Sequence, residues 1–351
     1  EEVRDIVMAM GETGAGIFQL AMERGEMQKM MGVYRSLADL SKKSGRPVTF
    51  GSLSRKKYPG QWKALYEIIE EENQQGARIW TQVHSREINS ILSFETATPF
   101  DNWDVWKEFR QFPIEQQLQK LKTDAALKQK LIDIADRPYE GPEIVGAEAR
   151  PPEWEMFYHM DKIRLPHPSV AEIGRERGIT PAAAMVEIAI EHDFKAFFRQ
   201  PLANENQDDA LALMRHPRSN VTFSDSGAHV SQIMDSSLQT HLLSHWVRER
   251  GEFTLEEAVR MITYDTSTNW GFHDRGLLRE GLVADITVFN PDTVEPRMPE
   301  VVHDLPSGSK RLKQYADGML ATVVAGQVVL KENEHTGALP GQLLRGPLAR
   351  Q

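Results

Sequence analysis

The chain has 351 residues, a formal net charge of −10 and no cysteine. This length allows about two domains, and 40% hydrophobic with 26% charged residues is ordinary globular composition. The acidic balance argues against nucleic acid as a partner, because phosphate binding needs a basic face. The missing cysteine excludes disulfides and thiolate sites, and since no run approaches about 18 consecutive apolar residues, we expect no membrane span.

The chain opens on Glu1 rather than on Met, inside an apolar pattern that predicts a helix over residues 1–11. A helix that starts at the first residue without a capping residue indicates either a cut or processed chain or a boundary chosen for expression. No charged-then-apolar export signal is visible in these residues. The cytoplasm is therefore the expected location.

After this helix, short apolar runs alternate with helical patterns. Runs at residues 17–20, 48–50 and 77–83 predict strands, and the apolar spacing at about 26–43 and 62–75 predicts helices between them. Strand, helix, strand, helix, strand at this spacing is typical of βαβ units with parallel strands.

A fourth unit follows much later in the chain. A helix is predicted from Pro181 to Asp193, a short strand at 221–223, and a helix from Leu255 to Ile262 with Thr254 as its N-cap. Between the third and fourth units lies a long, polar, helical insertion at about 90–216. A connection this long is typical of a lid or a subdomain rather than a simple loop.

The pattern changes from about residue 276 onward. Residues 284–291 predict a strand that ends in a turn, and residues 321–330 predict a hairpin around Ala325-Gly326. The last part of the chain therefore reads as a small β module that follows the α/β part.

The densest chemical stretch is Ser224-Asp225-Ser226-Gly227-Ala228-His229, directly after the predicted strand at 221–223. A carboxylate at the carboxyl end of a barrel strand lies where such barrels place their catalytic groups. Asp225 could there bind a divalent metal ion and take a proton from the metal-bound water, and His229 could touch or orient a substrate. Ser-Asp-Ser-Gly is also good turn chemistry, so Asp225 could instead cap a turn.

This stretch and several others resemble the amidohydrolase superfamily, and within it the branch of N-acyl-D-amino-acid deacylases, or D-aminoacylases. The other matching stretches are residues 242–251, 255–259, 275–289, 46–50 and 77–86. In this superfamily, the Gly-x-x-Ala-Asp sequence found within 275–289 joins the barrel to a small β domain. The resemblance covers nearly the whole chain except the insertion, where it is weak.

The resemblance implies an α/β fold: the second half of a (β/α)8 TIM-type barrel, strands 5–8, with a helical insertion, plus a small C-terminal β-sandwich domain. It divides the chain into residues 1–275, with the insertion at about 90–216, and residues 276–351. The implied reaction is metal-dependent hydrolysis of an amide bond, a C–N bond other than a peptide bond, in an N-acyl amino acid that is often D-configured. Asp225 would bind the metal ion and act as the general base toward the attacking water.

Two departures from the family pattern limit the expected metal centre. The family's His-x-His motif belongs to the first barrel strand, and no His-x-His occurs anywhere in this chain. The family's histidines on the fifth and sixth strands are also missing, since Ala21 and Ser52 or its neighbour stand near these positions. Neither side chain can bind zinc as imidazole does. We therefore expect at most one divalent ion, with zinc as the expected metal, held by Asp225 and by ligands from elsewhere.

Three side chains on or just after the strand at 77–83 are expected to face the same site. Arg86 could pair bidentately with a substrate carboxylate, or it could form a surface salt bridge. His84 could act as a ligand or an acid, although a structural hydrogen bond is the stronger expectation. Gln82 could hydrogen-bond the substrate, with the same structural alternative.

Other histidines and aromatic residues are given structural interpretations. His241 and His245 share a helical face, but residue 242 is Leu rather than the Glu of a zinc-protease helix, so we expect two ordinary histidines of a packed helix. His167 lies between two prolines, and we expect it in a surface loop. Trp154, Phe157, Tyr158 and His159 are expected to form a small core rather than an acyl pocket.

Three interpretations of the function remain open. The first is a metal-dependent hydrolase of a small-molecule N-acyl amino acid or related amide, completed by an N-terminal half-barrel from a partner chain or a homologous subunit. A four-stranded parallel sheet alone would expose strand edges at both sides. The second is a non-hydrolytic subunit with a scaffold or binding role, which the missing histidines favour. The third is an amidohydrolase that acts on a cyclic amide or an ester.

Overall fold

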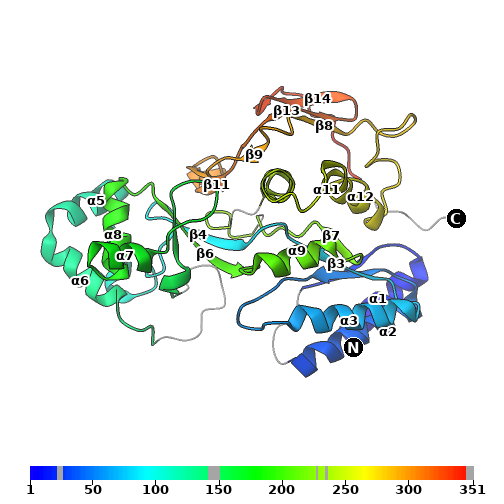
Figure 1. Cartoon of the computed structure of the whole chain (residues 1–351), viewed down its shortest axis with the longest axis horizontal. Helices are drawn as coiled ribbons and strands as arrows, with labels where there is room; N and C mark the ends of the chain where they lie inside the picture. Colours follow the sequence, from blue (N-terminus) through cyan, green and yellow to red (C-terminus); the bar gives the residue numbers. More distant parts are fainter. Residues whose placement is uncertain (22–26, 141–150, 227, 234–235, 345–351) are drawn as a thin grey trace.

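The computed structural model describes residues 1–21, 27–140, 151–226, 228–233 and 236–344 (Figure 1). Three predicted positions lie outside these ranges: Glu26 at a helix start, Gly227 within the dense chemical stretch, and the last residues, 345–351. None of the helices in the described part is long and apolar enough to cross a membrane.

A four-stranded parallel sheet is built from the predicted strands. Its order is β1-β2-β3-β7, and each neighbouring pair is parallel. The four strands are β1 (Phe18–Leu20), β2 (Val48–Gly51), β3 (Ile79–Val83) and β7 (Ser219–Val221). The succession of parallel strands read from the sequence is therefore confirmed, although the fourth strand ends two residues earlier than the predicted run.

Three helices cover one face of this sheet (Figure 1): α1 (Glu2–Thr13), α2 (Met27–Ser44) and α3 (Gln61–Gln74). Helix α2 buries Met30, Tyr34 and Leu37 at helical spacing, so an apolar stripe faces the strands. The core under these helices includes Phe50 of β2 and Ile79 of β3. Because side chains alternate along a strand, the strand residues next to Phe50 and next to Ile79 face away from the helices.

The opposite face of the sheet carries polar and aromatic side chains. Trp80 of β3 packs edge-on against Trp270, with ring centroids 5.1 Å apart. Gly51 at the end of β2 lies under the ring of Phe223, where an added Cβ would come within 2.5 Å of a ring carbon. Only glycine lets the segment after β7 fold back this closely over β2.

The insertion forms a lobe of helices attached to a second sheet, except for its last helix, α9 (Gln207–Arg215), which packs against the parallel sheet (Figure 1). The predicted helical part is confirmed, but the strands in it were not predicted. Its helices are α4 (Asp104–Arg110), α5 (Ile114–Thr123), α6 (Ala125–Ala135), η1 (Trp154–Met156), α7 (Val170–Arg177), α8 (Pro181–Glu191) and α9. Its strands are β4 (Ile88–Leu92), β5 (Tyr158–Met160) and β6 (Phe197–Ala203), antiparallel in the order β4-β6-β5.

The lobe has its own aromatic core. Trp106, Phe157 and Phe198 are fully buried in it, and the rings of Phe157 and Phe198 stack with centroids 5.6 Å apart. The interpretation of the aromatic residues at 154–159 as core is confirmed for Phe157, because it packs inside this cluster. Helix α8 begins at Pro181 with Thr180 as N-cap, as the Pro-initiated pattern predicted.

The chain then returns over the parallel sheet and ends in short antiparallel sheets (Figure 1). The helical elements are α10 (Leu238–His241), η2 (Leu242–Glu249), α11 (Leu255–Ile262), α12 (Tyr264–Asn269) and η3 (Pro306–Gly308). Thr254 and Glu257 form a capping box at the start of α11, which confirms the predicted N-cap.

The strands of this last part are β8 (Ile286–Phe289), β9 (Glu295–Pro296), β10 (Glu300–Val302), β11 (Arg311–Lys313), β12 (Ala316–Asp317), β13 (Met319–Val324), β14 (Gln327–Lys331) and β15 (Glu334–His335). One sheet has the order β15-β14-β13-β8, and two further strand pairs stand beside it. Ala325 and Gly326 form the predicted tight hairpin turn, both with positive φ (47° and 78°). The β-sandwich arrangement itself stays a prediction.

Candidate functional site

The carboxyl ends of β3 and β7 bring the predicted site segments to one edge of the parallel sheet. Val83 and Val221 are paired at these ends, so the residues that follow them leave the sheet side by side. His84 and Arg86 continue β3, and Asp225 lies four residues beyond β7. Catalytic groups of α/β sheets gather at this edge because loops from several strands converge there.

Asp225 lies in an exposed turn. Its backbone oxygen accepts a hydrogen bond from the N–H of Ala228 at 2.8 Å, and the hydroxyls of Ser224 and Ser226 lie 3.0 Å apart. His229 is also exposed and has a positive φ of 48°. The stretch thus has the turn chemistry that the sequence indicated, and it leaves both predicted site residues accessible to a substrate.

His84 is held inside the protein as a structural residue. It has no exposed surface, and its Nδ1 accepts a hydrogen bond from the backbone N–H of Arg86 at 3.0 Å. That nitrogen is therefore not available to a metal ion or a substrate. This geometry agrees with the stronger expectation for His84, a structural hydrogen bond.

Gln82 and Ser52 occupy the same end of the sheet with unused polar atoms. Gln82 is 5% exposed and Ser52 is 1% exposed. Within the described part of the chain, neither the Gln82 Nε2 nor the Ser52 Oγ has a hydrogen-bond partner. Buried polar groups are normally paired. Gln82 Nε2 can therefore donate a hydrogen bond to a ligand or a water at this edge, and Ser52 Oγ can donate or accept one.

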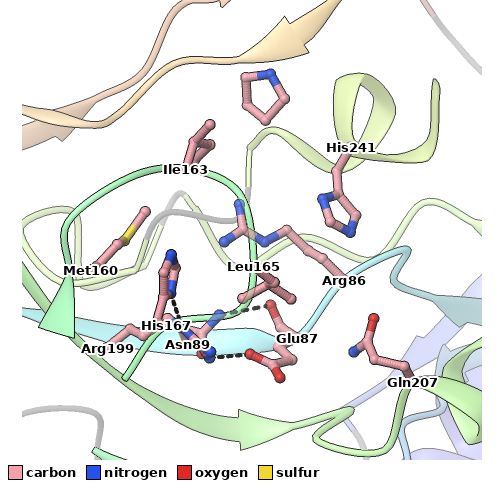
Figure 2. A pocket seen from close by; sticks show the side chains of 11 residues that line it. Arg86, Glu87, Asn89, Met160, Ile163, Leu165, His167, Arg199, Gln207 and His241 are labelled. Atoms are coloured by element: carbon pink, nitrogen blue, oxygen red, sulfur yellow. Dashed lines mark hydrogen bonds and ion pairs between the residues drawn. The ribbon is translucent and has the colours of Figure 1, made fainter. Parts of the chain in front are cut away.

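Arg86 lines a small cavity beside the carboxyl edge of the sheet. Its Nη1 donates to Ser237 Oγ at 2.6 Å. The cavity has a volume of about 30 Å³ and is lined by Arg86 together with Glu87, Asn89, Met160, Ile163, Leu165, His167, Arg199, Gln207, His241 and Pro296. In Figure 2 the Arg86 side chain reaches across the cavity toward Ile163. This volume is enough for a water molecule.

A buried polar network, which the sequence did not indicate, forms the floor of the cavity (Figure 2). Arg199 of β6 is 5% exposed and donates from Nη1 to Glu87 and from Nε to the Nδ1 of His167 at 2.8 Å. The Arg199 guanidinium also stacks over the Tyr158 ring, 4.3 Å from its centroid. Arg199 within the apolar run Phe197-Phe198 of β6 is the sequence signal that could have revealed this network. An arginine in a buried strand needs an acidic partner.

His167 corrects a prediction. It is 7% exposed, not a surface-loop residue, because the loop before α7 folds back onto β6. Its Nε2 lies 2.8 Å from the Lys162 carbonyl oxygen, so with Nδ1 accepting from Arg199 the ring is neutral and protonated at Nε2. Burial and the nearby Arg199 charge lower the pKa of His167 to about 4. Burial also raises the pKa of Glu87, against the opposing effect of Arg199.

His241 lines the same cavity, beside Arg86, and packs against His245. Their rings stack with centroids 4.9 Å apart. Burial, followed by the Arg86 charge, holds the pKa of His241 well below its usual value. The Nε2 atoms of both rings are buried and lack a partner among the described residues, whereas His245 Nδ1 contacts Glu249.

The residues present do not by themselves fit a metal ion. In the ranges that the structure describes, no group of three or more His, Asp or Glu side chains is placed to hold one. Ala21 and Ser52 follow β1 and β2, at the ends where imidazoles would have to stand. Asp225 is thus the one predicted ligand that this edge of the sheet offers.

Comparison with known sequences supports the predicted resemblance. The model of the family described as "Amidohydrolase family" matches residues 159–330. An N-acyl-D-aspartate deacylase of Alcaligenes xylosoxydans xylosoxydans is 30% identical over 168 residues, which are 47% of this chain and 28% of that protein. A D-aminoacylase of the same organism is 33% identical over 103 residues, 29% of this chain and 19% of that protein.

Solved structures show the same fold. An N-acyl-D-glutamate deacylase from Bordetella bronchiseptica, in complex with zinc and a phosphonate inhibitor, superposes with a TM-score of 0.55 at 17% identity, over 98% of this chain and 59% of that one. A D-aminoacylase with a binuclear metal centre gives 0.53 at 16%, over 96% and 57%. The chain spans less than two thirds of these relatives. The resemblance to the D-aminoacylase branch is confirmed.

Proposed function

We propose that this chain, which resembles N-acyl-D-amino-acid deacylases in sequence and fold, takes part in hydrolysing the amide bond of N-acyl amino acids of D configuration. The observation that carries the proposal is the edge where β3 and β7 end. The paired ends Val83 and Val221 bring Arg86 and Asp225 out of adjacent strands. The similarity to an N-acyl-D-aspartate deacylase supports the reaction class.

The roles follow from the chemistry of amide hydrolysis. The Asp225 carboxylate takes a proton from water as the water oxygen bonds to the amide carbonyl carbon. The proton is then given to the leaving nitrogen as the C–N bond breaks, which releases a carboxylic acid and a free amino acid. Arg86 binds the carboxylate of the substrate amino acid, Gln82 donates from its unpaired Nε2, and exposed His229 and buried His84 shape the site.

A divalent metal ion belongs to the proposal, with zinc as the expected ion. One of the structural neighbours contains zinc and another has a binuclear metal centre. Bound near Asp225, such an ion would polarise the amide carbonyl. The described residues hold no group of three or more His, Asp or Glu side chains around Asp225. We therefore propose that further ligands come from polypeptide outside them, and we keep the expectation of at most one ion.

The same reasoning leads us to propose a completing partner. Strands β1 and β7 are the outer strands of the described parallel sheet, and parallel sheets are normally paired or covered at such edges. The chain spans 57–59% of the structural neighbours that it matches. An N-terminal half-barrel, in the same polypeptide, a partner chain or a homologous subunit, would pair with both edges and supply the missing ligands.

A second candidate function is a scaffold or binding subunit without hydrolytic activity. The specific observation in its favour is that Ala21 and Ser52 stand where β1 and β2 would have to offer imidazoles. Such a subunit would retain Arg86 and Gln82 for binding an N-acyl amino acid. It would not need Asp225 as a base.

The experiment compares the natural full-length protein with its Asp225→Asn variant. Free amine release is measured from N-acetyl-D-aspartate, N-acetyl-D-glutamate and their L forms, with and without added Zn²⁺. We expect release from a D substrate and a loss of roughly 10²–10⁴-fold in the variant, as for removal of a general base. Asp292→Asn, an exposed aspartate in a turn of the β module, is the matched control.

Two outcomes would contradict the hydrolase proposal. A folded Asp225→Asn protein with unchanged activity would remove Asp225 from catalysis. If the natural protein binds the D substrates in a calorimetric titration and releases no amine at any metal concentration, the scaffold function replaces the hydrolase.

A further inference from the structure

A second cleft lies at the opposite edge of the parallel sheet, where the strands begin. It has a volume of about 660 Å³. It is lined by residues that precede β1, β2, β3 and β7, by the first residues of β3, and by the end of α12 with the segment that follows it. A cleft of this size is in the range of small-molecule sites. It is more than twenty times the volume of the cavity beside Arg86 (660 against 30 Å³).

Three arginines enter this cleft for a reason that lies in the strand register. Val48 of β2 is paired with Ile79 of β3. Arg46 stands two residues before Val48, and Arg78 stands one residue before Ile79. Arg218 stands one residue before β7. Because parallel neighbours begin at one edge, side chains just before them meet there. All three arginines line the cleft, together with His273.

The cleft is cationic in an acidic protein. Among the described residues that line it there is no Asp or Glu, although the chain has a net charge of −10. Among the described residues, one carboxylate pairs with these arginines: Glu70 of α3 accepts from the Nε of Arg218 at 3.1 Å. The negative charge of Glu70 offsets one of the three guanidinium charges, so about two positive charges remain at this edge.

Arg46 and Arg78 are positioned by backbone oxygens and keep donors unused. Arg46 Nη1 donates to the Gly14 carbonyl oxygen, which holds its guanidinium across the loop between α1 and β1. Its Nε is buried and has no acceptor in the described part of the chain. Arg78 makes one long contact, 3.4 Å from Nη1 to the Gly45 oxygen. A buried guanidinium N–H without an acceptor is costly, so an incoming oxyanion would satisfy it.

We propose that this cleft binds the phosphate group of a small molecule. Guanidinium groups form paired hydrogen bonds to phosphate oxygens, and a phosphate monoester carries about two negative charges at neutral pH, which matches the charge of the cleft. The remaining volume holds the organic part of the ligand beside Trp80 and Asn269. The proposal does not involve the candidate catalytic residue, because the cleft lies at the other edge of the sheet from Asp225.

The test is a calorimetric titration of the full-length protein with inorganic phosphate at pH 7.5 and constant ionic strength. Acetate is titrated in parallel. We expect saturable phosphate binding at one site, with acetate weaker. Arg78→Gln should weaken phosphate binding roughly tenfold to a hundredfold, as expected for losing charge-assisted hydrogen bonds. Arg175→Gln, which removes an exposed arginine paired with Glu155 in the insertion, should bind phosphate as the natural protein does.

Several results would overturn the proposal. These are the absence of saturable phosphate binding, acetate binding as tight as phosphate, or an Arg78→Gln protein with unchanged affinity. Arg46→Gln provides the second variant, with a circular dichroism spectrum and melting temperature as the check on folding. If both folded variants bind phosphate with the natural affinity, the anion is bound elsewhere and this cleft is not its site.

Discussion

The two edges of the parallel sheet collect arginines in opposite ways. Near the carboxyl edge, Arg199 has Glu87, Asn89 and His167 as partners, and Arg86 donates to Ser237. At the amino edge, Arg46 keeps an unpaired Nε and Arg78 has one long contact. The register of the parallel strands gathers arginines at the amino edge, whereas Arg199 comes from β6 of the second sheet. The comparison teaches that local partners then decide whether a charge stabilises the fold or is available to a ligand.

The largest expected effect is at Arg199. Its replacement by Met leaves the Glu87 carboxylate buried without its guanidinium, and breaking one partner of a buried pair costs about 3–5 kcal/mol. Urea unfolding followed by fluorescence measures this loss. Arg175→Met, which removes the exposed partner of Glu155, should cost no more than about 1 kcal/mol. Equal losses in the two variants would show that the network below the Arg86 cavity is not a buried ion pair.

The second effect is a pH dependence carried by His167. Its pKa of about 4 in the folded protein is below the ordinary 6.5, so the unfolded chain binds the proton first. The stabilisation is therefore complete above about pH 6.5 and is lost as the pH falls toward 4, by on the order of 3 kcal/mol.

The measurement compares the natural protein with His167→Gln, whose amide can accept from Arg199 and donate to the Lys162 oxygen without titrating. Urea unfolding at pH 7 and at pH 4.5 gives the free energy of unfolding of both proteins. The natural protein should lose more stability between these values. A parallel loss in both would assign the acid sensitivity to other groups.

A smaller effect is expected at Gly51, where the carboxyl edge is closely packed. An alanine Cβ would come within 2.5 Å of the Phe223 ring, so the ring and the segment leading to Asp225 must shift. Overpacking of this kind costs about 1–3 kcal/mol. Thermal unfolding measures the loss, and Gly32→Ala in α2, where an added Cβ meets nothing within 4 Å, is the matched control and should be neutral or stabilising.

The smallest effect on stability is expected at the amino edge. Arg78 is exposed and has one long hydrogen bond, so Arg78→Gln should change the free energy of unfolding by no more than about 0.5 kcal/mol. The same variant should lose phosphate affinity. A stability loss above about 2 kcal/mol in chemical unfolding would make Arg78 a structural residue and remove the contrast between the two edges.

Much of the fold could be predicted because its signals are local. Alternating apolar runs and helical stripes indicated β1 to β3 and α1 to α3, and Thr254 with Glu257 marked the start of α11. The second sheet was missed for a physical reason. Strand β6 contains Arg199 and Pro201, which are rare in buried strands, and it becomes a strand only by pairing with β4 more than 100 residues earlier.

The candidate site was predictable to a smaller degree. Asp225, His229, Arg86, Gln82 and His84 could be chosen because each follows or ends a predicted strand, and strand ends are readable from sequence. Their surroundings could not be read in the same way. His84 accepts a hydrogen bond from the Arg86 backbone, and His167 is buried against Arg199. Both arrangements depend on how the loops fold, which the sequence pattern does not show.

The sequence by itself determined the order of parallel strands, the helix starts, the β hairpin at Ala325-Gly326 and the resemblance to D-aminoacylases, because these depend on residues near one another in the chain. Only the tertiary structure decided which arginines are paired and which are left with free donors. The physical reason is that a charge is stabilised by its partners within a few ångströms, and in this protein those partners come from segments as far apart as Glu87 and Arg199.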